Sequence, residues 1–270
     1  MAESVLSGVQ QALYEELKSK ITTVASKGGS TKFSISADLG LTWQTTARGK
    51  ALDKEVSSHF DALNTSKIIN CLLVDCPYEL YWYEKTASTT WEYGYTTTTT
   101  GNKTTVRIKN ISVNMPVCNS YASGRYKVNA KIVQLAKQAA ANARMIVQKF
   151  SSYTETEKLI GYKEIICYLT SYNDEAVEWE EYGDPWQLIY VFDGDDSTNV
   201  VCEGYSKAFQ YLCDFSDITC YTVTGTMDGG TGAGPHMWNI VENDGKYYMA
   251  DITNCDEGTV GENGGLFLDT

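Results

Sequence analysis

The sequence predicts an α+β protein, with a helical and antiparallel-sheet region in its N-terminal part and a helix packed on an antiparallel sheet in its C-terminal part. Three observations predict this class. Apolar residues recur at helical spacing over 3–27, β-branched and aromatic runs over 89–113 are typical of paired strands, and two apolar runs near the C-terminus flank a turn signal at 243–246. The 270 residues, 43% of them hydrophobic, are enough for one large or two modest cores.

The N-terminal part is expected to place its helices before its strands. The first helix carries Val5, Leu13, Leu17 and Ile21 on a single apolar stripe. Runs rich in aromatic residues and threonine then indicate three strands of an antiparallel sheet. We expect helices over 3–27, 49–63 and 66–76, and strands over 78–84, 89–97 and 104–113.

The C-terminal part is expected to begin with two helices. One covers 127–150, and the next starts at Thr154, where Glu157 completes a capping box. A further helical pattern begins at Cys202, directly after the extended stretch STNVV. Cys202 is therefore placed at a helix N-terminus, where the helix dipole stabilises a thiolate and the amide of Cys202 itself can bind an oxyanion.

The segments HMWNIVE and YYMADIT are expected to form two antiparallel strands, because Asp244-Gly245 between them is a strong hairpin signal. Side chains alternate between the two faces of a strand, so this register places His236 and Asp251 on the same face, within reach of a hydrogen bond. The expected pairs are Glu242 with Tyr247, Trp238 with Asp251, and His236 with Thr253.

Cys202, His236 and Asp251 together provide the groups that a cysteine-dependent catalyst needs. A thiolate attacks a carbonyl carbon, a histidine carries the proton, and a carboxylate holds the histidine in the required tautomer. The chain has two histidines, and His59 lies in a plausible amphipathic helix, so His236 is the candidate base. Each of these residue types is more often structural when it occurs alone, but the three in register indicate a catalytic triad.

The local sequences around these three residues resemble the transglutaminase-like superfamily, and in particular its bacterial members, which are built on a papain-like core. The resemblance is strong over about residues 197–254 and looser back to about residue 154. The motifs that carry it are CEGYS at 202–206, HMWN at 236–239 and DIT at 251–253.

This resemblance implies the fold and the residue roles. Residues 121–270 would form a papain-like, transglutaminase-like catalytic core, and residues 1–120 an N-terminal α+β accessory region. Cys202 would be the nucleophile, His236 the general base and acid, and Asp251 its orienting partner. The sheet of the family normally continues past the aspartate strand, so we expect the core to be truncated at its C-terminus or to be completed by other segments.

Further residues are candidates for binding the substrate and the oxyanion. Asp195 and Asp196 occupy the stretch where papain-type proteases carry the glutamine of the oxyanion hole, so Trp186 or Gln187 could supply the second donor. Gly204 leaves room for a substrate backbone. The candidate oxyanion and substrate-binding residues are Trp186, Gln187, Glu203, Gly204, Tyr205 and Trp238.

Acidic residues are concentrated in the C-terminal part. Residues 1–120 carry 12 basic and 11 acidic residues, whereas 121–270 carry 10 and 23, and nine of these acids lie between Asp174 and Asp196. A solvated loop would explain this run. Alternatively, the run borders the active site and attracts a cationic or amine-bearing peptide or protein substrate. The same negative charge disfavours nucleic acid as a partner.

The function favoured by the sequence is thiol-dependent acyl transfer or hydrolysis on peptide or protein amides. Water as acceptor makes a protease or amidase and a lysine amine makes a crosslinking enzyme, and the sequence leaves both open. The alternative from another class is a non-catalytic cell-surface binding module that retains the fold. We expect no cofactor and no metal site, because the chain has no Cys-x-x-Cys pair and two histidines.

Several features of the sequence bear on the location of the protein. No apolar run is long enough to cross a membrane, and the N-terminal segment is an amphipathic helix instead of a signal peptide. The run of five threonines and the abundance of tyrosine suggest an exported bacterial protein. We therefore expect an extracellular or cell-surface protein whose signal peptide is not part of this sequence.

The spacing of the eight cysteines gives no disulfide framework.

Overall fold

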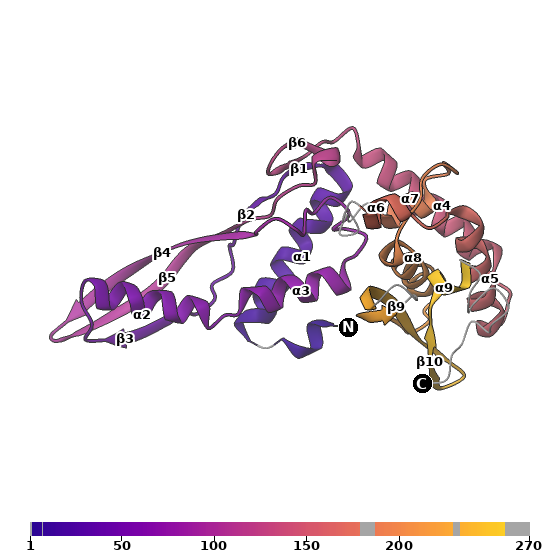
Figure 1. Cartoon of the computed structure of the whole chain (residues 1–270). Coiled ribbons are helices and arrows are strands. Elements are labelled where there is room, and N and C mark those ends of the chain that lie inside the picture. The colour runs from indigo at the N-terminus through magenta and orange to yellow at the C-terminus, as the bar shows by residue number, and fades with distance from the viewer. Residues whose placement is uncertain (1, 7, 179–186, 229–232, 257–270) are drawn as a thin grey trace. The chain divides into compact units, whose positions relative to one another are not determined.

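The chain folds into two compact units, Met1–Lys131 and Ile132–Thr270 (Figure 1). The computed structural model describes residues 2–6, 8–178, 187–228 and 233–256. Both units contain helices and antiparallel strands, which confirms the predicted α+β class. The sequence places the domain boundary after residue 120, and the assignment of the two parts as accessory region and catalytic core stays a prediction.

The helices of unit 1 follow the predicted apolar spacing. Helix α1 buries Leu13, Leu17 and Ile21 along one side and packs against α3. It begins later than predicted because Gly8 has a positive φ of 52°, so Val5 belongs to a separate short helix and is exposed. The helices are η1 (Ala2–Val5), α1 (Val9–Lys27), α2 (Lys50–Asp61), α3 (Thr65–Asp75) and η2 (Asn119–Tyr121).

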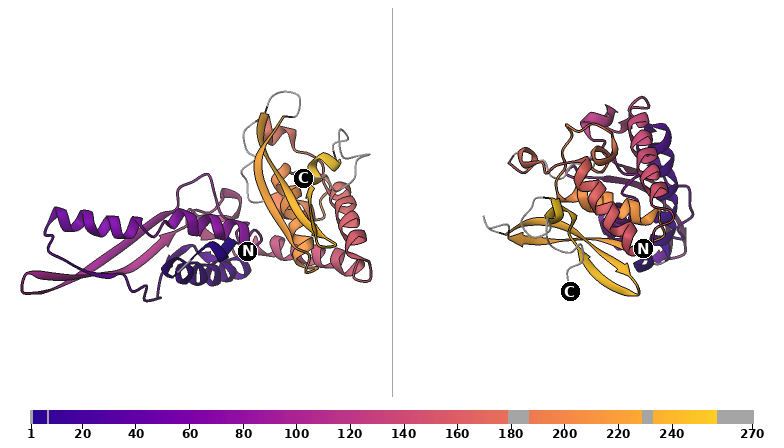
Figure 2. Two further views of the ribbon diagram at one scale, coloured as in Figure 1. Left: turned by 90° about the horizontal axis from the view of Figure 1, so that it is seen from below. Right: turned by 90° about the vertical axis from the view of Figure 1, so that its right-hand side faces the viewer.

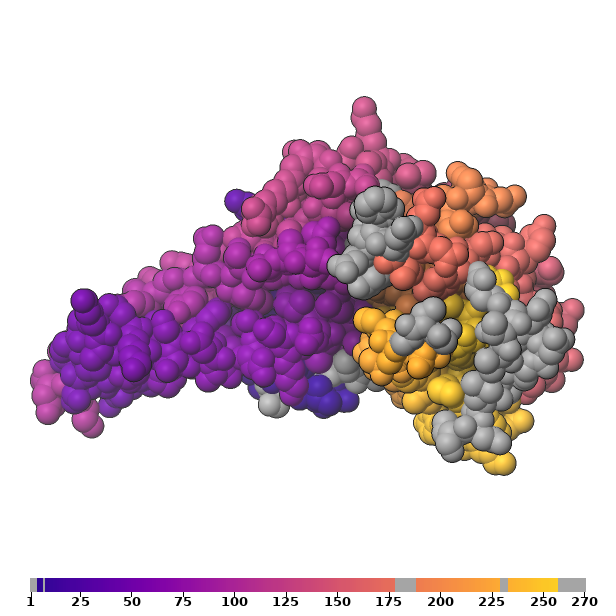
Figure 3. Space-filling model, in the orientation of Figure 1, coloured from indigo at the N-terminus to yellow at the C-terminus, as the bar shows by residue number. Residues whose placement is uncertain are grey.

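Strand β5 organises the main sheet of unit 1 and pairs with β2, β3 and β4. The long β4–β5 hairpin confirms the strands predicted over 89–97 and 104–113, and its tip extends beyond α2 (Figure 1). Phe60 of α2 stacks on Tyr93 of β4 with ring centroids 4.0 Å apart. Helix α2 and this hairpin form part of the surface seen in Figure 3. The strands are β1 (Gly29–Ser30), β2 (Lys32–Ser34), β3 (Thr42–Thr45), β4 (Thr90–Thr100), β5 (Lys103–Asn114), β6 (Ala122–Gly124) and β7 (Lys127–Val128).

The segment 78–84 does not form the predicted strand. Its backbone turns instead, with the N–H of Tyr83 donating to the C=O of Leu80, and it contributes only an isolated bridge between Tyr83 and Val117. The four side chains at 80–83 are all buried. Because successive side chains of a strand point to opposite faces, four consecutive buried side chains fit a turn that is surrounded by the core.

Helix α8 lies at the centre of unit 2. It contacts α4, α5, α7 and α9 as well as β8 and β9, and Figure 2 shows it beside the sheet of unit 2. Unit 2 therefore contains the predicted helix on an antiparallel sheet. The helices are α4 (Val133–Lys149), α5 (Glu155–Leu169), α6 (Asp174–Glu178), α7 (Gln187–Phe192), α8 (Cys202–Asp214) and α9 (Ile252–Asp256).

The predictions for the two helices at the start of unit 2 have different outcomes. Thr154 and Glu157 form the predicted capping box at the start of α5. The helix predicted over 127–150 begins later, at Val133, because residues 127–128 belong to strand β7 of unit 1 and pair with β1. Strand pairing therefore overrides the helical pattern at this point.

The sheet of unit 2 has the order β10-β9-β8, so β9 is its central strand. The predicted pairing of Glu242 with Tyr247 is confirmed. Asp244 and Gly245 both have positive φ values, 51° and 73°, as a two-residue type I′ turn requires. No strand is predicted over β8 from the sequence. The strands are β8 (Cys220–Asp228), β9 (Ala233–Asn243) and β10 (Lys246–Ala250).

Candidate active site

Cys202 is the first residue of α8, as predicted. Val201 before it is extended, with φ −95° and ψ −179°, so the backbone changes direction at the cysteine. The first N–H groups of a helix have no acceptor within that helix, and they concentrate the positive end of the helix dipole. The thiol of Cys202 is partly exposed, so it combines an electropositive backbone environment with access from solvent.

His236, on the central strand β9, is buried and connects the other two candidate residues. Its Nε2 atom lies 2.7 Å from Oδ2 of Asp251, and its side chain is also hydrogen-bonded to that of Cys202. Because Nε2 meets the carboxylate, Nδ1 is the ring nitrogen that can exchange a proton with the thiol. The structure therefore brings Cys202, His236 and Asp251 together in the predicted sequence of contacts.

Asp251 reaches His236 from a different local structure than predicted. Strand β10 ends at Ala250 and α9 begins at Ile252, so neither Asp251 nor Thr253 pairs with β9 as a strand residue. Asp251 is instead the residue before the first turn of α9. Its Oδ1 atom accepts a hydrogen bond from the backbone N–H of Asn254 (3.3 Å), which is the N-cap pattern. One carboxylate oxygen thus caps a helix while the other binds the imidazole.

The environment of His236 favours the protonated ring. Burial would lower the pKa of His236, but the hydrogen bonds and charges of Asp251 and Cys202 outweigh it and raise the pKa to about 9. The imidazolium form is therefore dominant at neutral pH. An imidazolium next to a thiol favours the thiolate, which is the nucleophilic form of cysteine.

Several other cysteines lie in environments that disfavour the thiolate. Burial raises the pKa of Cys167 to about 12 and that of Cys255 to about 11, and it also raises the pKa values of Cys71 and Cys213. All eight cysteines belong to the described residues and are free thiols. Cys202 differs from these four thiols in its position at the start of α8 beside His236.

The three residues that follow Cys202 pack inside unit 2. Glu203 is buried and forms an ion pair with Lys207 (2.7 Å). Tyr205 is fully buried, and its hydroxyl donates to Asp256 at the end of α9. A Cβ at Gly204 would lie 2.5 Å from the Cβ of Val200. Glu203, Gly204 and Tyr205 therefore make packing contacts within unit 2, and their contacts with substrate stay a prediction.

Trp238 stays a candidate for substrate binding. Its ring lies nearly parallel to that of His236, with centroids 5.9 Å apart and an interplanar angle of 21°. The side chain is half-buried, and on the neighbouring strand it covers Gly225, where a Cβ would lie 2.6 Å from the indole ring. The absence of a side chain at Gly225 thus allows Trp238 to lie flat beside the candidate base.

The predicted second oxyanion donor is not located. Trp186 lies outside the described residues, and Gln187 is described only as the first residue of α7. The amide of Cys202 is therefore the one predicted oxyanion donor whose position is described. The roles of Trp186 and Gln187 stay predictions.

Two residues that connect α8 to β9 were not predicted as functional. The hydroxyl of Ser206 donates to the C=O of Met237 (2.8 Å), and Nδ2 of Asn239 donates to the C=O of Ser206 (3.0 Å). These bonds fix α8, which begins at Cys202, against the strand that carries His236. Both residues belong to the motifs CEGYS and HMWN, so the signal was present in the sequence without an assigned role.

Asn254 is a third residue without a predicted role, and it contacts the carboxylate of Asp251 directly. Its Nδ2 atom donates to Oδ2 of Asp251 (2.7 Å), the same oxygen that meets His236. Its position three residues after Asp251 is the one from which an N-cap receives its backbone hydrogen bond. The pattern Asp-x-x-Asn before a short helix could have indicated this contact.

Part of the acidic run lies next to the chain that leads into Cys202. The N–H of Asn173 donates to the C=O of Val200 (2.9 Å), and α6 begins at the following residue. Asp174 and Glu175 are both exposed. Two carboxylates thus lie on the segment that is hydrogen-bonded directly upstream of the candidate nucleophile.

The remainder of the acidic run is only partly described. The carboxylates of Asp193 and Asp195 accept hydrogen bonds from the nearby hydroxyls of Thr198 and Ser197. Residues 179–186 lie outside the described part of the chain. Over the described residues, no group of three histidine, cysteine or acidic side chains could hold a metal ion.

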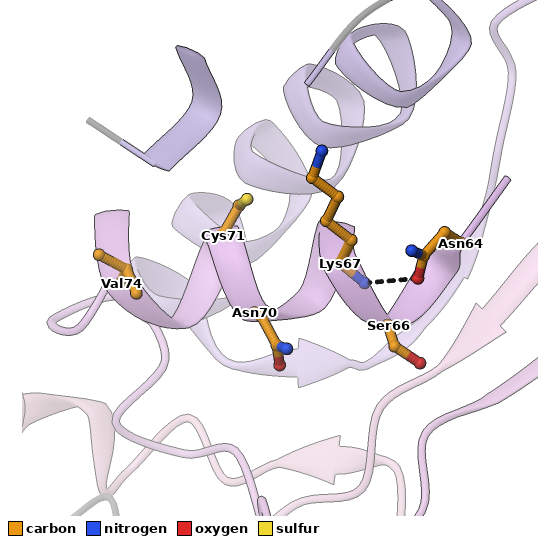
Figure 4. A pocket seen from close by; sticks show the side chains of 6 residues that line it. All are labelled: Asn64, Ser66, Lys67, Asn70, Cys71 and Val74. Atoms are coloured by element: carbon orange, nitrogen blue, oxygen red, sulfur yellow. Dashed lines mark hydrogen bonds between the residues drawn. The ribbon is translucent and has the colours of Figure 1, made fainter. Parts of the chain in front are cut away.

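A separate hollow in unit 1 does not offer comparable chemistry. It has a volume of about 330 Å³ and lies along α3 (Figure 4). Its thiol, Cys71, has a pKa raised by burial, and no histidine lines the hollow. The lining residues are Asn64, Ser66, Lys67, Asn70, Cys71 and Val74.

Comparisons with known proteins give a distant structural likeness. No protein-family model matches the chain, and no curated protein matches it by sequence. A solved structure described as the crystal structure of a TGase is similar over 63% of this chain and 46% of that chain, with 16% identity and a TM-score of 0.40. The chain thus spans less than half the length of that protein. This likeness does not assign an activity, so we base the proposed function on the geometry of the site.

Within the described residues, no helix combines the length and the apolar character needed to cross a membrane.

Proposed function

We propose that the chain is a cysteine-dependent enzyme that transfers the acyl group of a peptide or protein amide, in the manner of transglutaminase-like and papain-like enzymes. The observation that carries the proposal is the row of contacts from the Cys202 thiol through His236 to the Asp251 carboxylate. Cys202 at the start of α8 adds the helix dipole. In this proposal Cys202 is the nucleophile, His236 the proton carrier and Asp251 the group that orients His236.

The first half-reaction forms an acyl-enzyme. His236 takes the thiol proton at Nδ1, and the thiolate of Cys202 attacks the carbonyl carbon of the amide. The oxyanion that develops on the carbonyl oxygen is stabilised by the amide of Cys202. The carbon–nitrogen bond then breaks, His236 donates its proton to the departing amine, and a thioester remains on Cys202.

The second half-reaction depends on the acceptor. His236 removes a proton from water or from an amine, the acceptor attacks the thioester carbonyl, and the Cys202 thiolate leaves. Water yields a carboxylic acid, and an amine yields a new amide. The carboxylate of Asp251 stabilises the imidazolium. The reaction as proposed needs no cofactor.

A cationic acceptor or substrate is favoured by the acidic residues near the site. Asp174 and Glu175 follow directly after Asn173, which is hydrogen-bonded to the segment before Cys202. Carboxylates near a cleft raise the local concentration of cations. We therefore propose a peptide or protein partner that carries a lysine side chain or another amine.

Capture of the acyl-enzyme tests the proposed function. Incubation with a mixed pool of peptides and proteins, followed by an acid quench, should leave a hydroxylamine-sensitive adduct on the Cys202 peptide, because a thioester is the expected intermediate. Mass spectrometry of the adduct identifies the acyl group, and product analysis in ¹⁸O-water with and without added amine identifies the acceptor.

The control for this experiment is Cys202→Ala, which should carry no adduct. A wild-type protein that stays unmodified across the pool, or that is modified equally at its buried cysteines, would contradict the proposal. That outcome would favour the alternative of a non-catalytic binding module that retains the fold.

The salt dependence of acceptor choice tests the role of the acidic residues. Amine acceptors should lose their advantage over neutral alcohols as ionic strength rises, because exposed charges are screened beyond about 8 Å at physiological salt. The double variant Asp174→Asn, Glu175→Gln should show a smaller preference for amines already at low salt. Rates of acyl transfer to both acceptors provide the measurement. Equal salt dependence in the wild type and this variant would show that these two carboxylates are only a solvated surface.

A further inference from the structure

The carboxylate of Asp251 accepts three hydrogen bonds, and Asn254 donates two of them. Oδ2 accepts from Nε2 of His236 and from Nδ2 of Asn254, both at 2.7 Å. Oδ1 accepts from the backbone N–H of Asn254 at 3.3 Å. Hydrogen bonds to an ionised group are stronger than those between neutral groups. The hydrogen bonds from Asn254 therefore help to determine the orientation of the Asp251 carboxylate.

Asn254 is itself held in place from a second element. Its Nδ2 atom lies 3.1 Å from Sδ of Met227 on β8, in addition to its contact with Asp251. A side-chain amide has two N–H hydrogens, and these two contacts use both of them. The amide is therefore fixed between the edge strand of the sheet and the start of α9.

We infer that Asn254 is a positioning residue that holds the Asp251 carboxylate in the orientation in which Oδ2 meets the imidazole of His236. The terminal torsion of an aspartate is broad and is not fixed by rotamer preference alone. The amide of Asn254 restricts it, because Oδ2 accepts from both the amide and the ring. The relevance to catalysis rests on the proposed function, whereas the effect on His236 does not.

The ionisable groups near Asp251 do not obscure the effect of Asn254 on the pKa of His236. Cys255 of α9 lies near Asp251, and burial raises its pKa to about 11, so it stays neutral below that pH. Lys163 of α5 and Asp256 of α9 act on Cys255 with opposite signs. Cys202 is the remaining ionisable partner of His236.

The titration of His236 tests the inference without a substrate. The chain has two histidines, so protein labelled with ¹³C,¹⁵N-histidine gives two ring signals, and His59 of unit 1 serves as the internal reference. In Asn254→Leu, the carboxylate should turn away from the ring, and the pKa of His236 should fall from about 9 by about one pH unit or more. If Asn254 only competed with His236 for Oδ2, the pKa would rise.

The rate at which iodoacetamide labels Cys202 provides a second measurement. At neutral pH the labelling rate should be about tenfold lower in Asn254→Leu than in the wild type. The variant loses the charge-assisted hydrogen bond from Asn254 to Asp251, so a smaller fraction of His236 is protonated and the thiolate of Cys202 is less stabilised. Asn254→Ala, which cannot overfill the site, should behave in the same way. Asn142→Leu is the matched control, because Nδ2 of Asn142 also donates one partly buried hydrogen bond, to the C=O of Phe192 (2.8 Å).

The outcomes separate this inference from the proposed function. An unchanged or raised His236 pKa in both Asn254 variants, or labelling as fast as in the wild type and in Asn142→Leu, overturns the inference. A fall in the His236 pKa in the Asn254 variants supports it, even if the wild type never forms an acyl-enzyme, and in that case only the proposed function fails.

Discussion

Replacing Asp251 with asparagine should reduce turnover by about 10³- to 10⁴-fold, the size of effect expected when the orienting carboxylate of a triad is neutralised. Asp251 is one of the groups that raise the pKa of His236 to about 9. Without its charge the pKa should fall towards the ordinary value of 6.5, so less imidazolium is present at neutral pH. Because an amide can also present its NH₂ group to Nε2, the ring should change tautomer as well.

A second variant separates the charge of Asp251 from its structural role. Asparagine caps helices about as well as aspartate, so Asp251→Asn should keep α9 and unfold at nearly the wild-type temperature. Asp251→Ala removes the cap as well and should cost about 1 kcal/mol of stability. The measurements are thermal unfolding and kcat/KM across pH, on an amide that acyl-enzyme capture has identified. Turnover of a stable Asp251→Asn protein within tenfold of the wild type would refute the role assigned to Asp251.

The parts of the fold that could be predicted from the sequence depend on local interactions. The turn at Asp244 and Gly245 determines the register of β9 and β10, because both residues adopt positive φ values. The capping box of Thr154 and Glu157 involves residues three apart and is present. Both the turn and the capping box depend only on residues close in the sequence, and the structure contains both.

The parts that could not be predicted depend on contacts between distant segments. Residues 80–83 have the apolar and aromatic side chains typical of a strand, yet all four are buried in the core and the backbone forms a turn. The two-residue strands β1 and β7 pair with each other from distant parts of the unit 1 sequence, and β7 also pairs with β6. A pattern of two residues carries no periodicity that a sequence could reveal.

The candidate site shows the same distinction. The order of Cys202, His236 and Asp251 indicated their proximity, whereas the packing contacts of the residues that follow Cys202 could not be inferred from the motif. Tyr205, which follows three residues after Cys202 in the motif CEGYS, is buried in the core, and its hydroxyl donates to Asp256. Asn254 was missed because its role depends on α9 starting at Ile252, where a continuing strand was expected.

Substitution of Gly204 by alanine should destabilise unit 2 and also displace Cys202. In an open helix this change is stabilising by about 1 kcal/mol. Here the new Cβ would lie 2.5 Å, 2.7 Å and 3.1 Å from the three side-chain carbons of Val200. Val200 cannot move easily, because its side chain is fully buried and its backbone N–H and C=O are bonded to Ser171 and Asn173. The start of α8 must shift instead, which moves Cys202 relative to His236.

We expect Gly204→Ala to lower the free energy of unfolding by about 1–2 kcal/mol, since overpacking of a core typically costs about 1–3 kcal/mol, and to slow alkylation of Cys202 at neutral pH. The cost should be smaller in a Val200→Gly background, which removes all three of the carbons in short contact. Gly234→Ala is the matched control on β9, because a Cβ there meets no atom within 4 Å. Denaturant unfolding of the four proteins in the Val200–Gly204 cycle measures the coupling. If the losses in free energy of unfolding are strictly additive, the packing of Val200 does not require a glycine at position 204. In that case the close approach at the start of α8 does not position the thiol of Cys202.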